Sequence, residues 1–186
     1  MARAPIRIVG AALRVERRRR HARWMLGSIC TLLIAALGAS AAMPPRPRLL
    51  WNASASAPVG LWRVLPDVRA GRGDMVVVRL DEPWRGLAAR RRYLPANVPL
   101  IKRVAAVPGD RICAFEAWVF VEGRLVATRR RADVAGRPLS WWHGCRTLRD
   151  GAMLLLMDDP ESFDGRYFGP IGRQAIVGKA LPLWAR

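Results

Sequence analysis

The chain has 186 residues, and because the first ~50 have the composition of a targeting segment and linker, roughly 135 remain to form a folded domain. That length suits one domain with a substantial core and excludes a chain of several domains. The formal net charge is +18, and much of the excess lies in residues 1–23, where eight arginines accompany one glutamate. Such a net positive charge is typical of proteins that bind nucleic acid or anionic lipid.

Residues 24–43 carry no charged side chain and are long enough to cross a bilayer as a helix. Trp24 stands where an interfacial aromatic residue would lie. Because the arginines flank the N-terminal side, the positive-inside rule predicts that residues 1–23 form a cytoplasmic segment. The rest of the chain then lies across the membrane, which in a bacterium with two membranes is the periplasm. We therefore predict a single-pass protein of the cell inner membrane.

Two alternatives to this interpretation of the N-terminus stay open. A cleavable signal peptide is the first, because Ala39, Ser40 and Ala41 resemble a small-residue cleavage site, although the long apolar run favours an anchor. Nucleic-acid binding by the arginines is the second, but a basic run beside a membrane span is more often a topology signal. No nucleic-acid partner is therefore expected. The proline-rich residues 44–50 are predicted to be a stiff linker to a domain at 51–186.

A pair of serines follows the linker. The segment NASASAPVGLW, at 52–62, places Ser54 and Ser56 two residues apart. In an extended segment such residues point to the same face, so both hydroxyls can reach one site. This arrangement indicates chemistry held close to a membrane surface. The alternative is a polar turn that leads into a strand, with proline and glycine as ordinary turn residues.

The remaining domain is predicted to be mostly β, because short apolar runs alternate with Gly, Pro and Asp and helical periodicity is poor. Glu122 and Gly123 form a two-residue link typical of a hairpin. The basic residues 83–93 are predicted to be an exposed excursion or short helix, and residues 129–145 a loop. The predicted strands lie at 61–64, 74–80, 98–107, 118–121, 124–127 and 152–157, and a last one begins at 175–179.

Lys102 lies in the predicted strand at 98–107, where alternate residues share a face. Aliphatic neighbours on its face remove water from the amine, which disfavours the ammonium form and lowers the pKa. A neutral lysine can act as the general base for a serine nucleophile, so Lys102 and the serine pair together suit a Ser–Lys acyl-transfer site. The alternative is that Lys102 lies at a strand edge and extends its ammonium group to water. The neighbours on its face are Val98, Leu100, Val104 and Ala106.

The cysteines give no sign of a metal site. Cys30 lies inside the apolar span and is interpreted as a small apolar filler. Cys113 and Cys145 lie in the exported domain, where they either form a disulfide or remain two buried thiols. Neither has the spacing of metal ligands, and the nearest histidine is His143. We therefore expect neither a metal nor a cofactor.

Three segments, in order behind an N-terminal anchor, resemble the type I signal peptidase family: NASASAPVGLW, IKRVAAVPGD and SFDGRYFGPI. More narrowly, they resemble its TraF-like branch, the maturation peptidases of conjugative transfer systems. Housekeeping signal peptidases usually have two residues between the serine and the proline of the first segment, whereas here Ala57 alone separates Ser56 from Pro58. Trp62 stands where this branch usually has tyrosine. The resemblance covers residues 50–183.

This resemblance implies a signal-peptidase-like antiparallel β domain with a serine–lysine dyad. Ser56 matches the nucleophile and Lys102 matches the general base. Ser54 matches the residue whose hydroxyl helps to form the oxyanion hole, together with the backbone N–H of the nucleophile. Ser162 matches a serine that orients the lysine.

The resemblance also assigns residues around the site. Asp164 and Arg166 match a supporting ion pair near the site; the alternative is a surface-proximal ion pair in a turn, without a direct role. Gly165 stands where the family often has serine. Cys113 and Cys145 match positions where the TraF-like branch often has a cysteine pair, which favours the disulfide.

The implied function is that of a membrane-anchored serine endopeptidase that processes exported or membrane-tethered precursors, with pilin precursors as substrates of the TraF-like branch. In the family, an extended face beside the serine pairs with the substrate as an added strand, and small pockets admit small side chains. Two other functions stay open. One is a general signal peptidase that serves many exported proteins, and the other is a non-catalytic, membrane-anchored component of a transfer apparatus that contacts DNA.

Overall fold

The computed structural model describes residues 5–42, 47–66 and 68–185. The chain divides into two units, Met1–Pro45 and Arg46–Arg186, each of which is described by itself. Four predictions fall partly on residues outside the described ranges. These are the first four residues of the basic segment, the last residue of the predicted span, residues 44–46 of the predicted linker, and residues 67 and 186 of the predicted domain.

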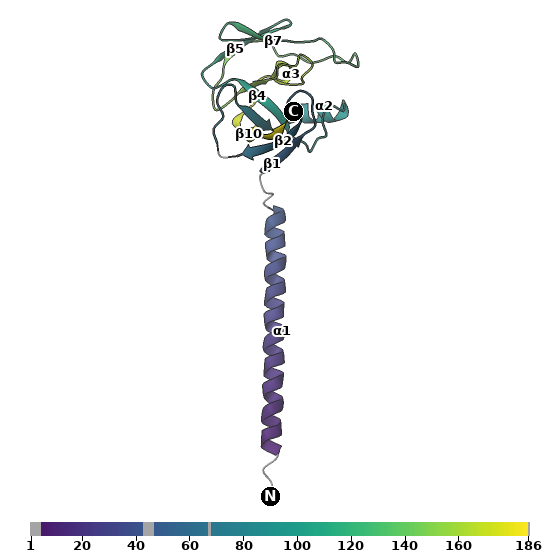
Figure 1. The fold of residues 1–186 in the computed structure, drawn as a ribbon, viewed down its shortest axis with the longest axis vertical. Helices are drawn as coiled ribbons and strands as arrows, with labels where there is room; N and C mark the ends of the chain where they lie inside the picture. Colours follow the sequence, from purple (N-terminus) through teal and green to yellow (C-terminus); the bar gives the residue numbers. More distant parts are fainter. Residues whose placement is uncertain (1–4, 43–46, 67, 186) are drawn as a thin grey trace. The chain divides into compact units, whose positions relative to one another are not determined.

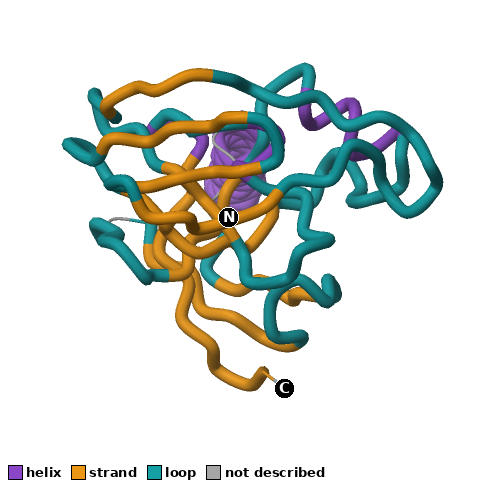
Figure 2. Tube along the Cα trace, turned by 90° about the horizontal axis from the view of Figure 1, so that it is seen from above, coloured by secondary structure: helices purple, strands orange, loops and turns teal. Residues whose placement is uncertain are grey.

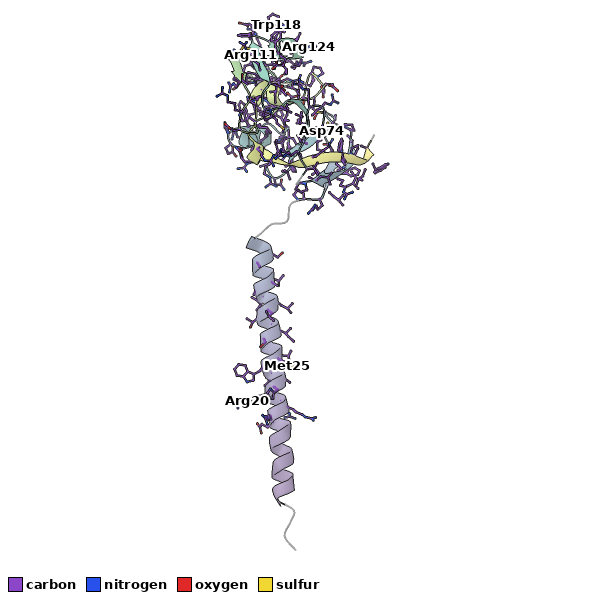
Figure 3. The ribbon with its side chains drawn as sticks, turned by 90° about the vertical axis from the view of Figure 1, so that its left-hand side faces the viewer. Arg20, Met25, Asp74, Arg111, Trp118 and Arg124 are labelled. Carbon is purple, nitrogen blue, oxygen red and sulfur yellow. A yellow bond between two sulfur atoms is a disulfide. The ribbon has the colours of Figure 1, made fainter. Side chains whose placement is uncertain are left out.

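The first unit is a helix, α1 (Pro5–Ala42), of 38 residues. The predicted span is helical as far as residue 42, but the helix begins well before it, within the basic segment. Its part Glu16–Ser40 is long and apolar enough to cross a membrane. Arg20 and Met25 mark the change from basic to apolar side chains along this helix (Figure 3). The apolar side chains of this part are exposed, as they must be if lipid is to surround them.

The second unit consists of two antiparallel sheets, which confirms the predicted fold class (Figure 1). The larger sheet has the strand order β1-β2-β10-β3-β4-β9, and the smaller sheet has the order β7-β6-β5-β8. The strands of the larger sheet are β1 (Leu49–Asn52), β2 (Gly60–Leu65), β3 (Met75–Val78), β4 (Leu100–Ala106), β9 (Leu154–Leu156) and β10 (Ile176–Ala185). Those of the smaller sheet are β5 (Arg111–Phe115), β6 (Trp118–Val121), β7 (Arg124–Thr128) and β8 (Gly144–Thr147).

Every strand predicted from the sequence is present, and the predicted hairpin joins β6 and β7 through Glu122 and Gly123. Both link residues have positive φ, 49° and 75°, which matches the twist that a two-residue hairpin requires. Three strands were not predicted, namely β1, β5 and β8. They are short, and β8 carries almost no apolar residues, so its extended form depends on pairing with β5 rather than on its own composition. The loop predicted at 129–145 therefore ends two residues early.

The smaller sheet carries the disulfide. Cys113 and Cys145 are directly opposite each other in the β5–β8 register, and their sulfur atoms are bonded. The alternative of two separate thiols is therefore wrong. Trp118, Arg111 and Arg124, from three strands of this sheet, lie together at one end of the unit (Figure 3). The bridge ties the end of the long 129–145 segment to this sheet.

Helices are a minor part of the second unit. The predicted excursion at 83–93 contains the short helix α2 (Trp84–Arg90), which lies among loops beside the strands (Figure 2). A second short helix, α3 (Gly165–Phe168), follows β9, and a 3-10 turn, Arg173–Ala175, leads into β10. Strand β4 lies between β3 and β9, so it is an interior strand with neighbours on both sides.

Candidate active site

A cleft of about 610 Å³ lies in the second unit, beside β4. Both serines of the predicted pair, together with Lys102 and Ser162, line it. The remaining walls are mainly apolar and come from the end of β1, from residues 93–95 and 98–100, from parts of the 130–139 loop and from the segment that precedes α3. Four of the predicted site residues thus face one cavity.

The serine pair lies in the connection between β1 and β2. Residues 55 and 56 form a turn, so the extended conformation expected for this segment is wrong. The turn nevertheless brings the hydroxyls together, because Ser54 Oγ and Ser56 Oγ are 2.9 Å apart. Ser54 is exposed and Ser56 is half-buried, so both hydroxyls are accessible from the cleft.

Lys102 reaches this pair from the middle of β4. Its Nζ lies 3.1 Å from Ser56 Oγ and 2.7 Å from Ser162 Oγ. The side chain is 2 % exposed, and its strand is interior. The alternative of a strand-edge lysine with its ammonium group in water is therefore wrong. Of the predicted aliphatic neighbours, Val104 and Ala106 are buried, and Val76, opposite Lys102 on β3, is fully buried as well.

Burial controls the protonation of Lys102. It lowers the pKa of the amine from 10.5 to about 8, and the Asp164 carboxylate opposes this shift in part by favouring the ammonium form. A substantial fraction of the amine is therefore neutral under mildly alkaline conditions. A serine hydroxyl within hydrogen-bond distance of such an amine is the arrangement that base-assisted acyl transfer requires.

Asp164 and Arg166 form an ion pair, with 2.8 Å between Arg166 Nε and Asp164 Oδ1. The alternative of a surface-proximal pair is wrong, because these side chains are 0 % and 3 % exposed. Arg166 also donates to the backbone carbonyls of Met157, Pro160 and Thr128. The pair thus holds the segment between β9 and α3, which carries Ser162, and joins it to the end of β7.

The close packing of α3 against β9 explains the glycine at position 165, between Asp164 and Arg166. Asp164 caps the helix by accepting a hydrogen bond from Arg166 N. At Gly165, an added Cβ would lie 2.6 Å from Leu155 O and 2.9 Å from Leu154 Cδ1. A larger residue therefore requires α3 to move away from β9, and with it the segment that carries Ser162.

Two parts of the cleft were missed from the sequence. The first is Asn52, whose side chain forms hydrogen bonds with the backbone of residues 54–58, the segment that carries Ser56 and is called the serine turn below. The second is the outer wall, where the Asp133 carboxylate accepts hydrogen bonds from Tyr93 and Arg137 and lies 3.7 Å from Arg91. This cluster links the α2 region to the 129–145 segment across 40 residues. An asparagine two residues before Ser54 is the one local signal. The Asp133 cluster has none, because its two halves, at 91–93 and 133–137, are 40 residues apart in sequence.

The family of this chain follows from comparison with known proteins. The model of the family described as signal peptidase, peptidase S26, matches residues 21–184. This chain belongs to that family. The expected resemblance is confirmed, and membership makes the chain a serine peptidase of the signal-peptidase type, whose substrates are precursor proteins. The family is membrane-anchored, in agreement with the apolar helix α1.

Sequence relatives of this chain include proteins named for plasmid and conjugal transfer. The chain is 36 % identical over 143 residues to a plasmid transfer protein TraF of Escherichia coli, an alignment that covers 71 % of the chain and 80 % of the relative. It is 35 % identical over 174 residues to a probable conjugal transfer protein TraF of Sinorhizobium fredii, with 88 % and 90 % covered. Among solved structures, a signal peptidase I of Enterococcus faecalis aligns with a TM-score of 0.35 and 19 % identity, over 60 % of this chain and 97 % of that one.

Proposed function

We propose that this chain is a membrane-anchored Ser–Lys endopeptidase that matures a pilin-like precursor for conjugative transfer. The observation that carries the proposal is the buried Lys102 amine, held between Ser56 Oγ at 3.1 Å and Ser162 Oγ at 2.7 Å. The names of the TraF relatives support the role in transfer. The arginines that precede the apolar part of α1 support a cytoplasmic N-terminus and a periplasmic catalytic domain in the inner membrane.

The proposed reaction begins with attack of Ser56 Oγ on the scissile carbonyl, while neutral Lys102 accepts the hydroxyl proton. The Ser54 hydroxyl and the Ser56 N–H donate hydrogen bonds to the developing oxyanion. The lysine then returns its proton to the leaving amine, and a water activated by Lys102 releases the acyl-enzyme. Ser162 keeps the lysine amine in line with Ser56 through its 2.7 Å hydrogen bond. Asp164 and Arg166 act through the segment that carries Ser162.

The substrate is proposed to bind as an extended strand. Strand β1 lies at one edge of the six-stranded sheet, and its residues 50–52 line the cleft beside the serine turn. An edge strand has unpaired backbone groups, which an extended precursor segment can satisfy as an added strand. A precursor tethered in the same membrane is the proposed form of this substrate.

We expect Ser56→Ala to abolish maturation, because nucleophile and base act as a unit. The test follows the mass of the pilin precursor of the same transfer system in cells that carry either the wild-type chain or the variant. Ser140→Ala is the matched control, since Ser140 is exposed and does not line the cleft. Processing that survives Ser56→Ala contradicts the catalytic proposal and favours the non-catalytic component. Accumulation of many unrelated exported precursors favours the general signal peptidase instead.

Ser54→Ala should impair the enzyme without abolishing its activity. Loss of one oxyanion donor typically lowers kcat by about 10²–10³-fold, and the dyad itself remains. Steady-state kinetics on a peptide that spans the cleavage site, with the full chain in detergent, measures this loss. A Ser54→Ala enzyme with the wild-type kcat would show that its hydroxyl, although 2.9 Å from Ser56 Oγ, has no part in the reaction.

A further inference from the structure

Asn52, the last residue of β1, is 8 % exposed and bonds to the serine turn with both ends of its amide. Its Nδ2 lies 2.9 Å from Ser54 O, 2.9 Å from Ala57 O and 3.1 Å from Pro58 O. Its Oδ1 accepts a hydrogen bond of 3.1 Å from Ser54 N. An amide has two N–H donors, so the three carbonyls share them. One side chain thus holds both ends of the turn that carries Ser56.

The turn has little backbone bonding of its own. Its hydrogen bond from Ala57 N to Ser54 O is 3.4 Å long, well beyond the common length of ~2.9–3.0 Å. On the far side, Trp62 Nε1 donates to Pro58 O at 3.1 Å, so the indole of β2 supports the end of the same turn. The side chains of two strands therefore define the turn more than its own peptide groups do.

The proposed oxyanion donors lie inside this frame. The Ser56 N–H meets Ser54 Oγ at 3.4 Å, and Ser54 Oγ is 2.9 Å from Ser56 Oγ. A contact as long as 3.4 Å is weak, so the N–H is readily released to a developing oxyanion. Donors stabilise an oxyanion only when they are aimed in advance at its position. The direction of these donors depends on the conformation of the turn, and the turn depends on Asn52.

We propose that Asn52 is a positioning residue, which holds the turn so that the Ser56 N–H and the Ser54 hydroxyl point to the oxyanion. This inference rests on the proposed Ser–Lys mechanism. Asn52 acts on the transition state rather than on Lys102 or on the binding of the extended substrate. Its loss should therefore lower kcat and leave KM and the pH dependence of the reaction nearly unchanged.

The decisive variant is Asn52→Asp in the full chain in detergent. Aspartate has the size of asparagine but no N–H donor, so it directs oxygen atoms at the three carbonyl oxygens and drives the turn open. We expect kcat to fall by about 10²–10³-fold, the range observed for a lost oxyanion donor, with KM within about threefold of wild type. Asn97→Asp is the matched control, because Asn97 is exposed, does not line the cleft, and gains the same charge. It should keep the wild-type kcat.

A peptide aldehyde supplies a readout that a purely structural role would not change. The Ser56 hydroxyl adds to the aldehyde carbonyl to form a hemiacetal, whose oxygen occupies the oxyanion position. In Asn52→Asp, the affinity of the enzyme for the peptide aldehyde should fall by the same factor as kcat. An uncleavable peptide analogue without the aldehyde should bind as it does to the wild type. Asn52→Ala removes all four bonds without burying a charge, and is measured in parallel in case the aspartate variant does not fold.

The outcomes separate this inference from the mechanism on which it rests. If Ser56→Ala is active, the Ser–Lys mechanism itself is wrong. If Ser56→Ala is inactive but a folded Asn52→Asp or Asn52→Ala keeps the wild-type kcat and aldehyde affinity, the role of Asn52 is wrong and the mechanism stands. A loss that appears in KM alone also overturns the inference, because it would assign Asn52 to substrate binding.

Discussion

Replacing Lys102 with methionine should lower kcat/KM by at least about 10⁴-fold, because nucleophile and base act as a unit. Lys102→Arg should be equally inactive, since a guanidinium stays protonated and cannot accept the serine proton. In the wild type, kcat/KM should rise about tenfold per pH unit at acidic to neutral pH and level off above pH 8. Only the neutral amine can accept the serine proton, and the pKa of Lys102 is about 8. Below that pH the neutral fraction increases with pH, so kcat/KM increases as well.

The titration of this amine can be measured directly, because Lys102 and Lys179 are the only lysines in the chain. NMR of protein labelled at the lysine side chains should follow the pKa of Lys102 in the full chain, and Lys179→Arg assigns the two signals. Lys179→Met is the matched activity control, since Lys179 pairs with Asp74 at 2.8 Å outside the cleft. A kcat/KM that is flat between pH 6 and 9 would exclude Lys102 as the base.

Replacing Arg166 with methionine should destabilise the folded domain by about 3–5 kcal/mol, the usual effect of removing one partner of a buried ion pair. The Asp164 carboxylate would remain fully buried without its counter-charge. The carbonyls of Met157, Pro160 and Thr128 would also lose a donor. Thermal unfolding of the full chain, followed by tryptophan fluorescence, should show a decrease in Tm of roughly 10 °C.

Arg85→Met is the control for this substitution. Arg85 pairs with Glu82 at 3.2 Å, and these side chains are 44 % and 57 % exposed. Exposed pairs contribute about 0–1 kcal/mol, so the variant should unfold close to the wild-type temperature. Equal Tm values for the two variants would contradict a supporting role for the buried pair. Because the pair holds the segment that carries Ser162, Arg166→Met should also lower activity.

Much of the fold was predictable because it is encoded in neighbouring residues. The apolar run of α1 and the strands at 75–78, 100–106 and 118–121 follow from composition and period over a few residues. Strands β1 and β8 were not predictable in this way. They are extended because they pair with β2 and β5, and β8 has little apolar character of its own.

The sequence by itself determined the chemistry available to this protein: a serine pair after a long apolar span, one lysine in an apolar strand and two cysteines in the β domain. Only the tertiary structure decided that Lys102 is in an interior strand, and that Ser56 and Ser162 reach its amine. These contacts join residues 46 and 60 positions apart. Local periodicity predicts on which face of a strand a residue lies, but not which other strands lie beside that strand.

The dependence on tertiary contacts also explains why other parts of the site could not be predicted from the sequence. The burial of Asp164 and Arg166 depends on how α3 packs against β9, and the shape of the serine turn depends on the side chain of Asn52. A charge in a turn and an asparagine at the end of a strand are common on protein surfaces. Their place in this site comes from what packs around them, because desolvation and hydrogen-bond geometry are properties of the assembled fold.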